Sequence, residues 1–177
     1  EVSQATCNAL YGALGVIACS QGTMNNFIWG NDDFQNYETI AGGTGAGPGF
    51  DGCDAVQSHM TNTRMTDPEI LEKRFPVRLE EFSIRRGSGG AGKWRGGDGV
   101  FRRLRFLQAV TVTTLCSHRI VPPFGVDGGQ AAKVGVNQAI LPGGRKIALG
   151  GNDQIDLPAG GVFEMFTPGG GGWGPPE

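Results

Sequence analysis

The residue types with the clearest chemical potential lie in a glycine-rich stretch, residues 85–99, with the sequence RRGSGGAGKWRGGDG. Glycine lets backbone N–H groups approach a ligand closely and point the same way, and nearby cations favour an anion. We therefore expect a binding or active-site loop, or the joint that positions one. Asp98 is a candidate catalytic acid or base beside these amides, and the alternative is a carboxylate that caps a turn. The candidate substrate-binding residues of the stretch are Gly89, Gly90, Lys93 and Arg95.

Two nucleotide-binding motifs match this stretch only superficially. Gly87, Gly89 and Gly92 fit G-x-G-x-x-G, and Gly87, Gly92 and Lys93 fit most of the phosphate loop of nucleotide triphosphatases. Both motifs work only when the glycines lead directly into a helix, whose N-terminus then binds the phosphates. Here Lys93 precedes Trp94 instead of Ser or Thr, and the following RGGDG cannot begin a stable helix. The sequence therefore argues against a nucleotide site in this stretch.

A second group of polar candidates precedes the middle of the chain. Glu38 stands before another glycine-rich stretch, residues 42–49, and is a second candidate catalytic carboxylate. The run SHMTNTR, residues 58–64, could orient a polar substrate, with His59 as a candidate catalytic residue and Asn62 and Arg64 as candidate substrate-binding residues. The alternative for this run is a structural hydrogen-bond network around a loop.

The second histidine, His118, follows Cys116 at strand spacing, which predicts both side chains on one face, roughly 6–7 Å apart. A Cys–His nucleophile pair needs direct contact and a third, orienting group. We therefore favour a buried cysteine and a surface histidine. The histidines and nearby aspartates could bind a metal ion, but no ligand spacing supports this, so metal binding is left open.

Composition narrows the class of protein. A net charge of −2 over 177 residues argues against a nucleic-acid binder that works through bulk positive charge. No apolar run is long enough to span a membrane, and the N-terminus lacks the pattern of a secretory signal. The four cysteines have no C-x-x-C spacing, and we expect reduced thiols and a cytoplasmic protein.

The remaining pattern predicts a helix at residues 2–18, which Ser3 can cap and which has Leu10, Leu14 and Ile17 on one face. A second helix follows Thr66, which has capping-box spacing to Glu69, and ends at residues 74–75. The predicted strands are residues 27–29, 37–40, 77–84, 100–107, 110–116, 134–141, 145–149, 154–157 and 162–166.

These elements predict an α+β fold that is mainly β, with an N-terminal helix and short strands followed by an antiparallel β-sandwich or barrel-like C-terminal half. Residues 1–76 would form a mixed α/β segment with a glycine-rich loop. Residues 77–168 would form an antiparallel β-rich segment, in one compact unit with the first. The glycines and prolines of residues 169–177 predict a flexible tail.

Several long motifs, in the same order, resemble the hydantoinase B / 5-oxoprolinase family. They are residues 58–72 (SHMTNTRMTDPEILE), residues 85–99, residues 20–26 (SQGTMNN), residues 37–39 (YET) with the following glycine loop, and residues 167–172 (TPGGGG). The resemblance covers nearly the whole chain. The DPEILE motif, residues 67–72, is more similar to ATP-dependent 5-oxoprolinase than to the N-methylhydantoinase or acetone carboxylase branches.

The resemblance implies an enzyme that opens a cyclic amide at the expense of ATP, converting 5-oxoproline to glutamate. The lactam oxygen would be phosphorylated, and water would then attack the activated carbon. ATP and a divalent cation would be cofactors of the full-length enzyme, bound by a hydantoinase A-type region outside this chain. The resemblance assigns no catalytic residues here, so the candidates above rest on residue chemistry alone.

The same resemblance sets the expected assembly. The chain begins with Glu1 and would be the C-terminal end of a hydantoinase B-type half, inactive by itself and part of an oligomer. Its partners would be the hydantoinase A-type region or subunit, the remainder of the B-type half and a small cyclic amide, with no nucleic acid or membrane. The alternatives are a structural or assembly domain without catalytic residues, and a small-ligand-binding β-sandwich.

Overall fold

The computed structural model describes residues 2–59 and 63–177, and its strands form two antiparallel sheets. One sheet has the order β2-β1-β5-β8 and the other β3-β4-β9-β6-β7. The elements are α1 (Val2–Ala13), β1 (Asn25–Gly30), β2 (Gln35–Thr39), α2 (Pro68–Arg74), β3 (Val77–Arg85), β4 (Gly99–Phe106), β5 (Val110–Cys116), β6 (Val136–Ile140), β7 (Lys146–Leu149), β8 (Asn152–Leu157) and β9 (Val162–Phe166). The predicted α+β, mainly β class and the antiparallel sandwich are confirmed.

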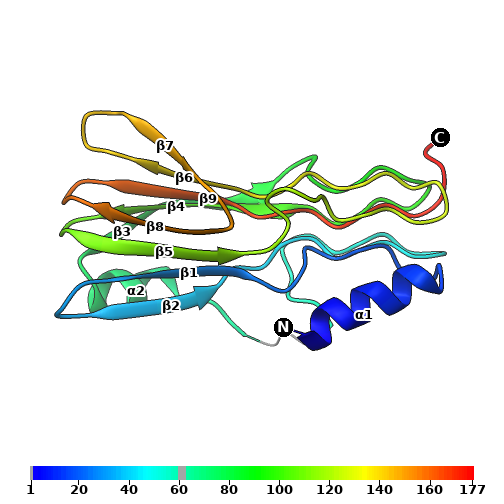
Figure 1. Cartoon of the computed structure of the whole chain (residues 1–177), viewed down its shortest axis with the longest axis horizontal. Helices are drawn as coiled ribbons and strands as arrows, with labels where there is room; N and C mark the ends of the chain where they lie inside the picture. Colours follow the sequence, from blue (N-terminus) through cyan, green and yellow to red (C-terminus); the bar gives the residue numbers. More distant parts are fainter. Residues whose placement is uncertain (1, 60–62) are drawn as a thin grey trace.

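The two sheets stack face to face in the left half of Figure 1 and bury an aromatic core between them. Phe27 of β1 stacks on Phe163 of β9 with ring centroids 4.7 Å apart, which ties one sheet to the other. Trp29 packs edge-on against Phe106 of β4 at 5.4 Å. Such offset and edge-to-face pairs are favourable geometries for buried rings.

Strand pairing joins the two expected segments, residues 1–76 and residues 77–168. β1 lies between β2 and β5, with Phe27 opposite Thr114 in the register. Residues 1–76 and 77–168 therefore contribute strands to one sheet, while the exact boundaries between segments stay a prediction. Buried and half-buried side chains alternate along β4, and Arg102 shares the buried face with Leu104 and Phe106.

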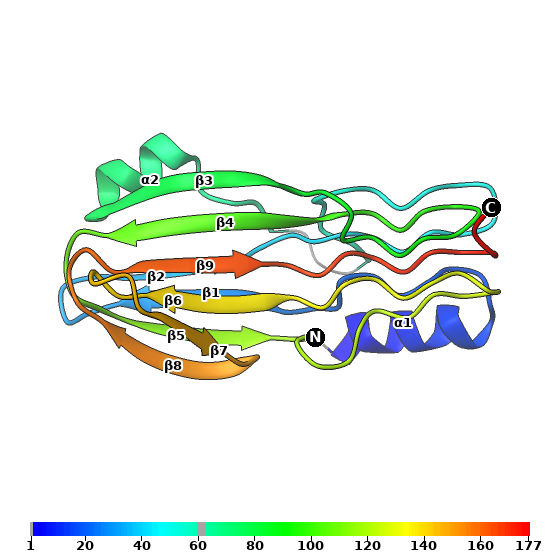
Figure 2. The same cartoon turned by 90° about the horizontal axis from the view of Figure 1, so that it is seen from above.

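Beyond the sandwich, extended segments without a sheet ladder run side by side and form what we term the glycine bundle (right half of Figures 1 and 2). Its segments are residues 16–22, 41–56, 87–98, 123–135 and 168–174, joined by backbone hydrogen bonds such as Gly170 N–H to Gly97 O (2.8 Å) and Gly97 N–H to Thr44 O (2.9 Å). A Cβ built on Gly170 would lie 1.9 Å from Thr44 O, and one on Gly43 would lie 1.9 Å from Gly97 O. Only glycine permits backbones to approach this closely, as at the axis of collagen.

The first residues of the expected flexible tail, 169–174, lie in the bundle, and the tail as a whole stays a prediction. Gly169–Gly172 are buried in the bundle, and Trp173 exchanges backbone hydrogen bonds with Trp94. The tail's glycines therefore serve close packing, because their missing side chains let neighbouring backbones reach each other.

The helices differ from expectation in their ends and faces. α1 ends at Ala13 and not at residue 18, because Gly15 adopts a left-handed backbone (φ 67°) and the chain then enters the bundle. Its buried residues are Gln4 and Asn8, whereas Leu10 and Leu14 are exposed. The second helix is confirmed as α2, with Asp67 and not Thr66 as the N-cap that accepts from Glu69 N–H. No helix among the described residues is long and apolar enough to cross a membrane.

The close backbone contacts yield a stability prediction. We expect Gly170→Ala to lower the free energy of unfolding by about 2 kcal/mol or more, because its methyl group meets a backbone carbonyl that cannot move aside. Gly143→Ala is the matched control, since a Cβ at Gly143 meets nothing within 4 Å. Urea unfolding followed by circular dichroism measures both variants. Equal midpoints for the two variants would contradict the packing described here.

Candidate functional site

The carboxylate of Asp98 binds the backbone of the glycine-rich stretch in which it lies. Asp98 is buried, and it accepts backbone N–H groups from Gly87 (3.2 Å), Ser88 (2.8 Å) and Gly89 (2.7 Å). Converging backbone amides of this kind are an anion-binding arrangement. Here the anion is supplied by the chain itself. The contacts favour the capping alternative for Asp98, and its catalytic role stays a prediction.

Arg95 and two further aspartates surround this carboxylate. Arg95 Nη2 lies 3.0 Å from Asp54 Oδ1 and its Nη1 lies 3.4 Å from Asp98 Oδ2, while Arg86 pairs with the other oxygen of Asp54 at 2.9 Å. The Arg95 backbone N–H donates to Asp51 at 2.6 Å. Burial alone would raise the pKa of Asp54, but the Asp98 N–H and the Arg95 guanidinium outweigh it and hold that pKa below its ordinary value. Arg86 and Arg95 are thus both paired within the chain.

Glu38 lies in β2 and forms a buried ion pair with Arg102 of β4. Glu38 Oε2 and Arg102 Nη2 are 2.8 Å apart, and both side chains are almost fully buried. Glu38 Oε1 accepts the backbone N–H of Thr66 at 3.1 Å, and Arg102 Nη1 lies 3.5 Å from the sulfur of Met65. Burial lowers the pKa of Arg102, and the Glu38 carboxylate opposes that effect. Through its contacts with Met65 and Thr66, the pair holds residues 65–66 against β2 and β4. Removing either partner would leave the other charge buried and unpaired.

His59 packs on α1. Its Nε2 lies 3.1 Å from Asn8 Oδ1, and its ring meets Tyr11 edge-on with centroids 5.3 Å apart. Asn8 Oδ1 also accepts the Ser20 N–H, which fixes the amide orientation, so His59 Nε2 carries the proton and donates. Burial lowers the pKa of His59. Its backbone is left-handed (φ 52°), a conformation that few residues other than glycine adopt, although histidine, asparagine and aspartate do so more often than most.

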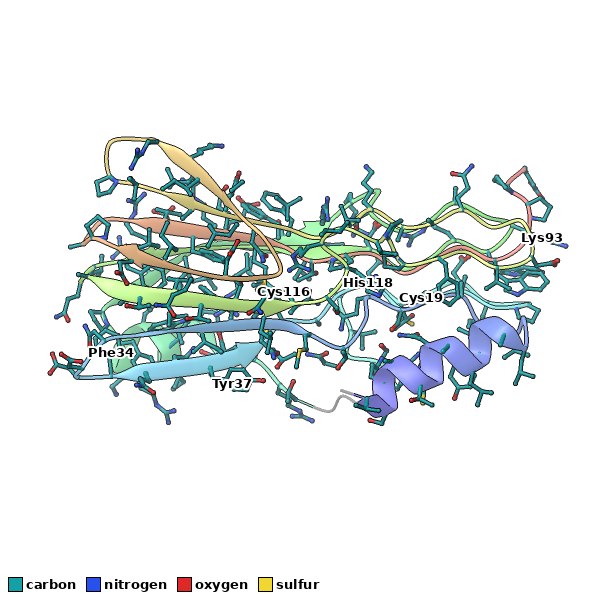
Figure 3. All side chains as sticks on the ribbon, in the orientation of Figure 1. Cys19, Phe34, Tyr37, Lys93, Cys116 and His118 are labelled. Carbon is teal, nitrogen blue, oxygen red and sulfur yellow. The ribbon has the colours of Figure 1, made fainter. Side chains whose placement is uncertain are left out.

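The other candidates do not gather around one point. Lys93 is exposed at the far end of the bundle, with its Nζ 4.7 Å from the Trp94 ring centroid (Figure 3). Arg64 is exposed, and Asn62 lies outside the described residues. Gly90 is buried, and a Cβ there would lie 2.1 Å from Gln130 O. Asp98, Arg95 and Gly89 therefore form one cluster, while Glu38 and His59 each belong to a separate internal network.

A grouping that the sequence did not predict lies between α1 and the bundle. Cys19 Sγ is 3.8 Å from His118 Nε2, and Figure 3 shows the two side by side, with Cys116 at the end of β5. His118 Nδ1 donates to Val121 O (2.7 Å), so Nε2 is the bare nitrogen that faces the thiol. Burial raises the pKa of Cys19 to about 11 and lowers that of His118, so both groups are neutral near pH 7.

The expected shared face of Cys116 and His118 is wrong. β5 ends at Cys116, and the left-handed backbone of His118 (φ 51°) turns its ring towards Cys19. Cys116 instead contacts Asn26 O at 3.6 Å. The sequence gives only a weak signal for the contact between Cys19 and His118, because the two residues are 99 positions apart.

The geometry does not fit a nucleotide phosphate at residues 87–93. The N–H groups of Gly87, Ser88 and Gly89 already donate to Asp98, so a phosphate would have to displace a buried carboxylate that has the same charge sign. Gly90 N–H donates to Gly170 O, and Lys93 N–H to Gly174 O. These amides hold the bundle together.

The Asp98 contacts predict a loss of stability. We expect Asp98→Ala to lower the free energy of unfolding by about 3 kcal/mol, because three N–H groups lose their charged acceptor. Asp98→Asn keeps one carbonyl oxygen and should lose roughly half as much. Urea unfolding and hydrogen exchange at residues 87–89 measure the effect. Two fully stable variants would show that Asp98 does not hold this loop.

Comparison with known proteins places the chain in a family. The family model described as hydantoinase B/oxoprolinase matches residues 1–176. The chain is 50% identical to a 5-oxoprolinase of Dictyostelium discoideum and 48% identical to 5-oxoprolinase 1 of Arabidopsis thaliana. Each match covers 97% of this chain. It spans only 14% of each of these relatives.

The fold is also found in a solved enzyme. The crystal structure of an ATP-dependent caprolactamase from Pseudomonas jessenii superposes with a TM-score of 0.74 at 23% identity, over 90% of this chain and 30% of that one. The likeness supports the arrangement of sandwich and bundle described above. On the family match and the two oxoprolinase relatives, the chain belongs to the hydantoinase B/oxoprolinase family.

Proposed function

We propose that this chain is part of an enzyme that opens a cyclic amide at the expense of ATP, with 5-oxoproline converted to glutamate. The proposal rests mainly on sequence identity: about half of the residues are identical to those of two 5-oxoprolinases over nearly the whole chain. The overall reaction is 5-oxoproline, ATP and two waters to glutamate, ADP and phosphate. Cleavage of ATP drives the hydrolysis because phosphorylation of the lactam oxygen makes the ring carbon a better electrophile.

Within that enzyme, we assign this chain the role of a rigid framework. Three of the candidate groups are bonded within the chain: Asp98 to backbone amides, Arg95 to Asp54 and Glu38 to Arg102. Asp98 and Glu38 are also buried, so these two carboxylates are poorly suited to exchange protons with a substrate. ATP, its divalent cation and the hydantoinase A-type partner belong to parts of the protein beyond this chain.

The framework role predicts a division of activity. We expect the complete parent protein to release one phosphate for each glutamate formed from 5-oxoproline. We expect residues 1–177 alone to release no phosphate from ATP. Coupled phosphate and glutamate assays on the two purified proteins measure this. Phosphate release by the 177-residue chain would place the nucleotide site within it, and an inactive parent protein would refute the proposed reaction.

In a second candidate role, His59 contributes to the hydrolytic site. One observation favours this role. His59 holds a left-handed backbone, and such strain gathers at functional sites. Its lowered pKa keeps the ring neutral near pH 7, with Nδ1 able to accept a proton because Nε2 carries the hydrogen donated to Asn8. In this role His59 would be a general base towards the attacking water.

Substitution separates the two roles of His59. In the complete parent protein, catalysis by His59 predicts that His59→Ala and His59→Gln both lower kcat by about 100-fold or more, with an unchanged unfolding midpoint. A framework role predicts a lower midpoint for His59→Ala, partial rescue by His59→Gln, which can still donate to Asn8, and nearly unchanged kcat. Steady-state kinetics and thermal unfolding on the same preparations decide between them.

A further inference from the structure

The faces of α1 are inverted relative to an ordinary surface helix. The inward side chains are polar: Gln4 and Asn8 are buried, and Asn8 bonds to Ser20 and His59. The outward side chains are mainly apolar: Leu10 is 53% exposed, and Leu14, the residue after the end of α1, is 64% exposed, while Ser3 and Thr6 are the polar exceptions. A surface helix normally turns its apolar stripe to the core and its charged residues to water. The exposed stripe on α1 is therefore unexplained by the packing within this chain.

Charge is missing from this region. Residues 2–31 contain no Asp, Glu, Lys or Arg, although charged residues make up 18% of the whole chain. Exposed leucines occur singly on many proteins, but Leu10 and Leu14 lie one turn apart with no charged residue near them in sequence, so they form one apolar patch at the C-terminal end of α1. Patches of this kind mark contact surfaces.

The patch continues across a groove onto the segment after β5. This segment runs alongside α1 in Figure 2 and exposes Ile120 (90%) and Val121 (68%). The groove between them has a volume of about 300 Å³ and is lined by α1 on one side and by His118 and Phe124 on the other. The Phe124 ring lies against Gly12, where a Cβ would be 2.6 Å away. We call the helix, the groove and the segment together the α1 surface. Its one charged residue, Arg119, directs its guanidinium inward to the buried Asn25 and Asn137.

We infer that the α1 surface is a permanent internal interface, covered by an uncharged, mainly apolar part of the same parent protein outside residues 1–177. This rests on the proposed function, because it takes the parent to be an enzyme of oxoprolinase length. The chain spans 14% of its oxoprolinase relatives, so most of such a polypeptide lies outside this structure. Permanent interfaces are more apolar than transient ones, whereas steering of a separate partner uses outward-facing charges that this surface lacks.

Site-specific thiol labelling of the complete parent protein tests the inference. Leu10→Cys and Leu14→Cys report on the α1 surface, and Leu107→Cys is the matched control, since Leu107 is also 53% exposed but lies in the turn after β4. The variants are treated with a maleimide, folded and in urea, and each position is quantified by peptide mass spectrometry. We expect the two α1 positions to react at least about tenfold more slowly than Leu107→Cys when folded, and all three to react alike in urea.

Two labelling outcomes would overturn the inference. Equal rates at Leu10→Cys, Leu14→Cys and Leu107→Cys in the folded protein would show that the α1 surface faces water. Protection that disappears on hundredfold dilution would show that a second copy covers it. The labelling does not depend on turnover. An inactive parent protein with protected α1 positions would therefore refute the proposed reaction alone, and an active one with reactive α1 positions would refute this inference alone.

Discussion

Close approach of one backbone to another is the constraint on which this structure depends. In the glycine bundle, carbonyl oxygens occupy the space where a side chain would begin, as Thr44 O does at Gly170. N–H and C=O groups of different segments then satisfy each other without forming a sheet. Buried backbone groups need such partners. A single Cβ at these positions would separate the segments and leave their hydrogen bonds unmade, so the chain's high glycine content is a packing requirement.

The bundle also determines what the polar residues near it can do. Gly87, Ser88 and Gly89 present converging N–H groups, an arrangement suited to an anion, and Asp98 fills it from within the chain. Arg95 pairs with this carboxylate and with Asp54, and Arg86 supplies the second positive charge through its own pair with Asp54. The same pattern recurs at Glu38 and Arg102 in the sandwich. A network whose members satisfy one another gives rigidity and a unique arrangement, which suits a framework for chemistry performed elsewhere in a larger enzyme.

The sequence predicted those features whose causes are local. The β-strands follow from alternation within each run, and α2 follows from Pro68 and the capping side chain just before it. The pairings that define the site were not predictable, because they join residues distant in sequence, such as Asn8 with His59 and Cys19 with His118. Arg102 was missed because its burial depends on the register between β4 and its neighbours and on Glu38 from β2. The bundle was missed because glycine carries no side chain and so leaves no periodic pattern.

The amides of residues 87–89 are all committed to Asp98, and those of Gly90 and Gly97 to the bundle. Hydrogen exchange in the complete parent protein, with and without millimolar phosphate or ATP, tests this most directly. We expect these amides to exchange slowly, as do those of residues 96–97 and 170–172, with rates that neither anion changes. Rapid exchange that slows when phosphate or ATP is added would instead show that residues 87–89 form a ligand-binding loop.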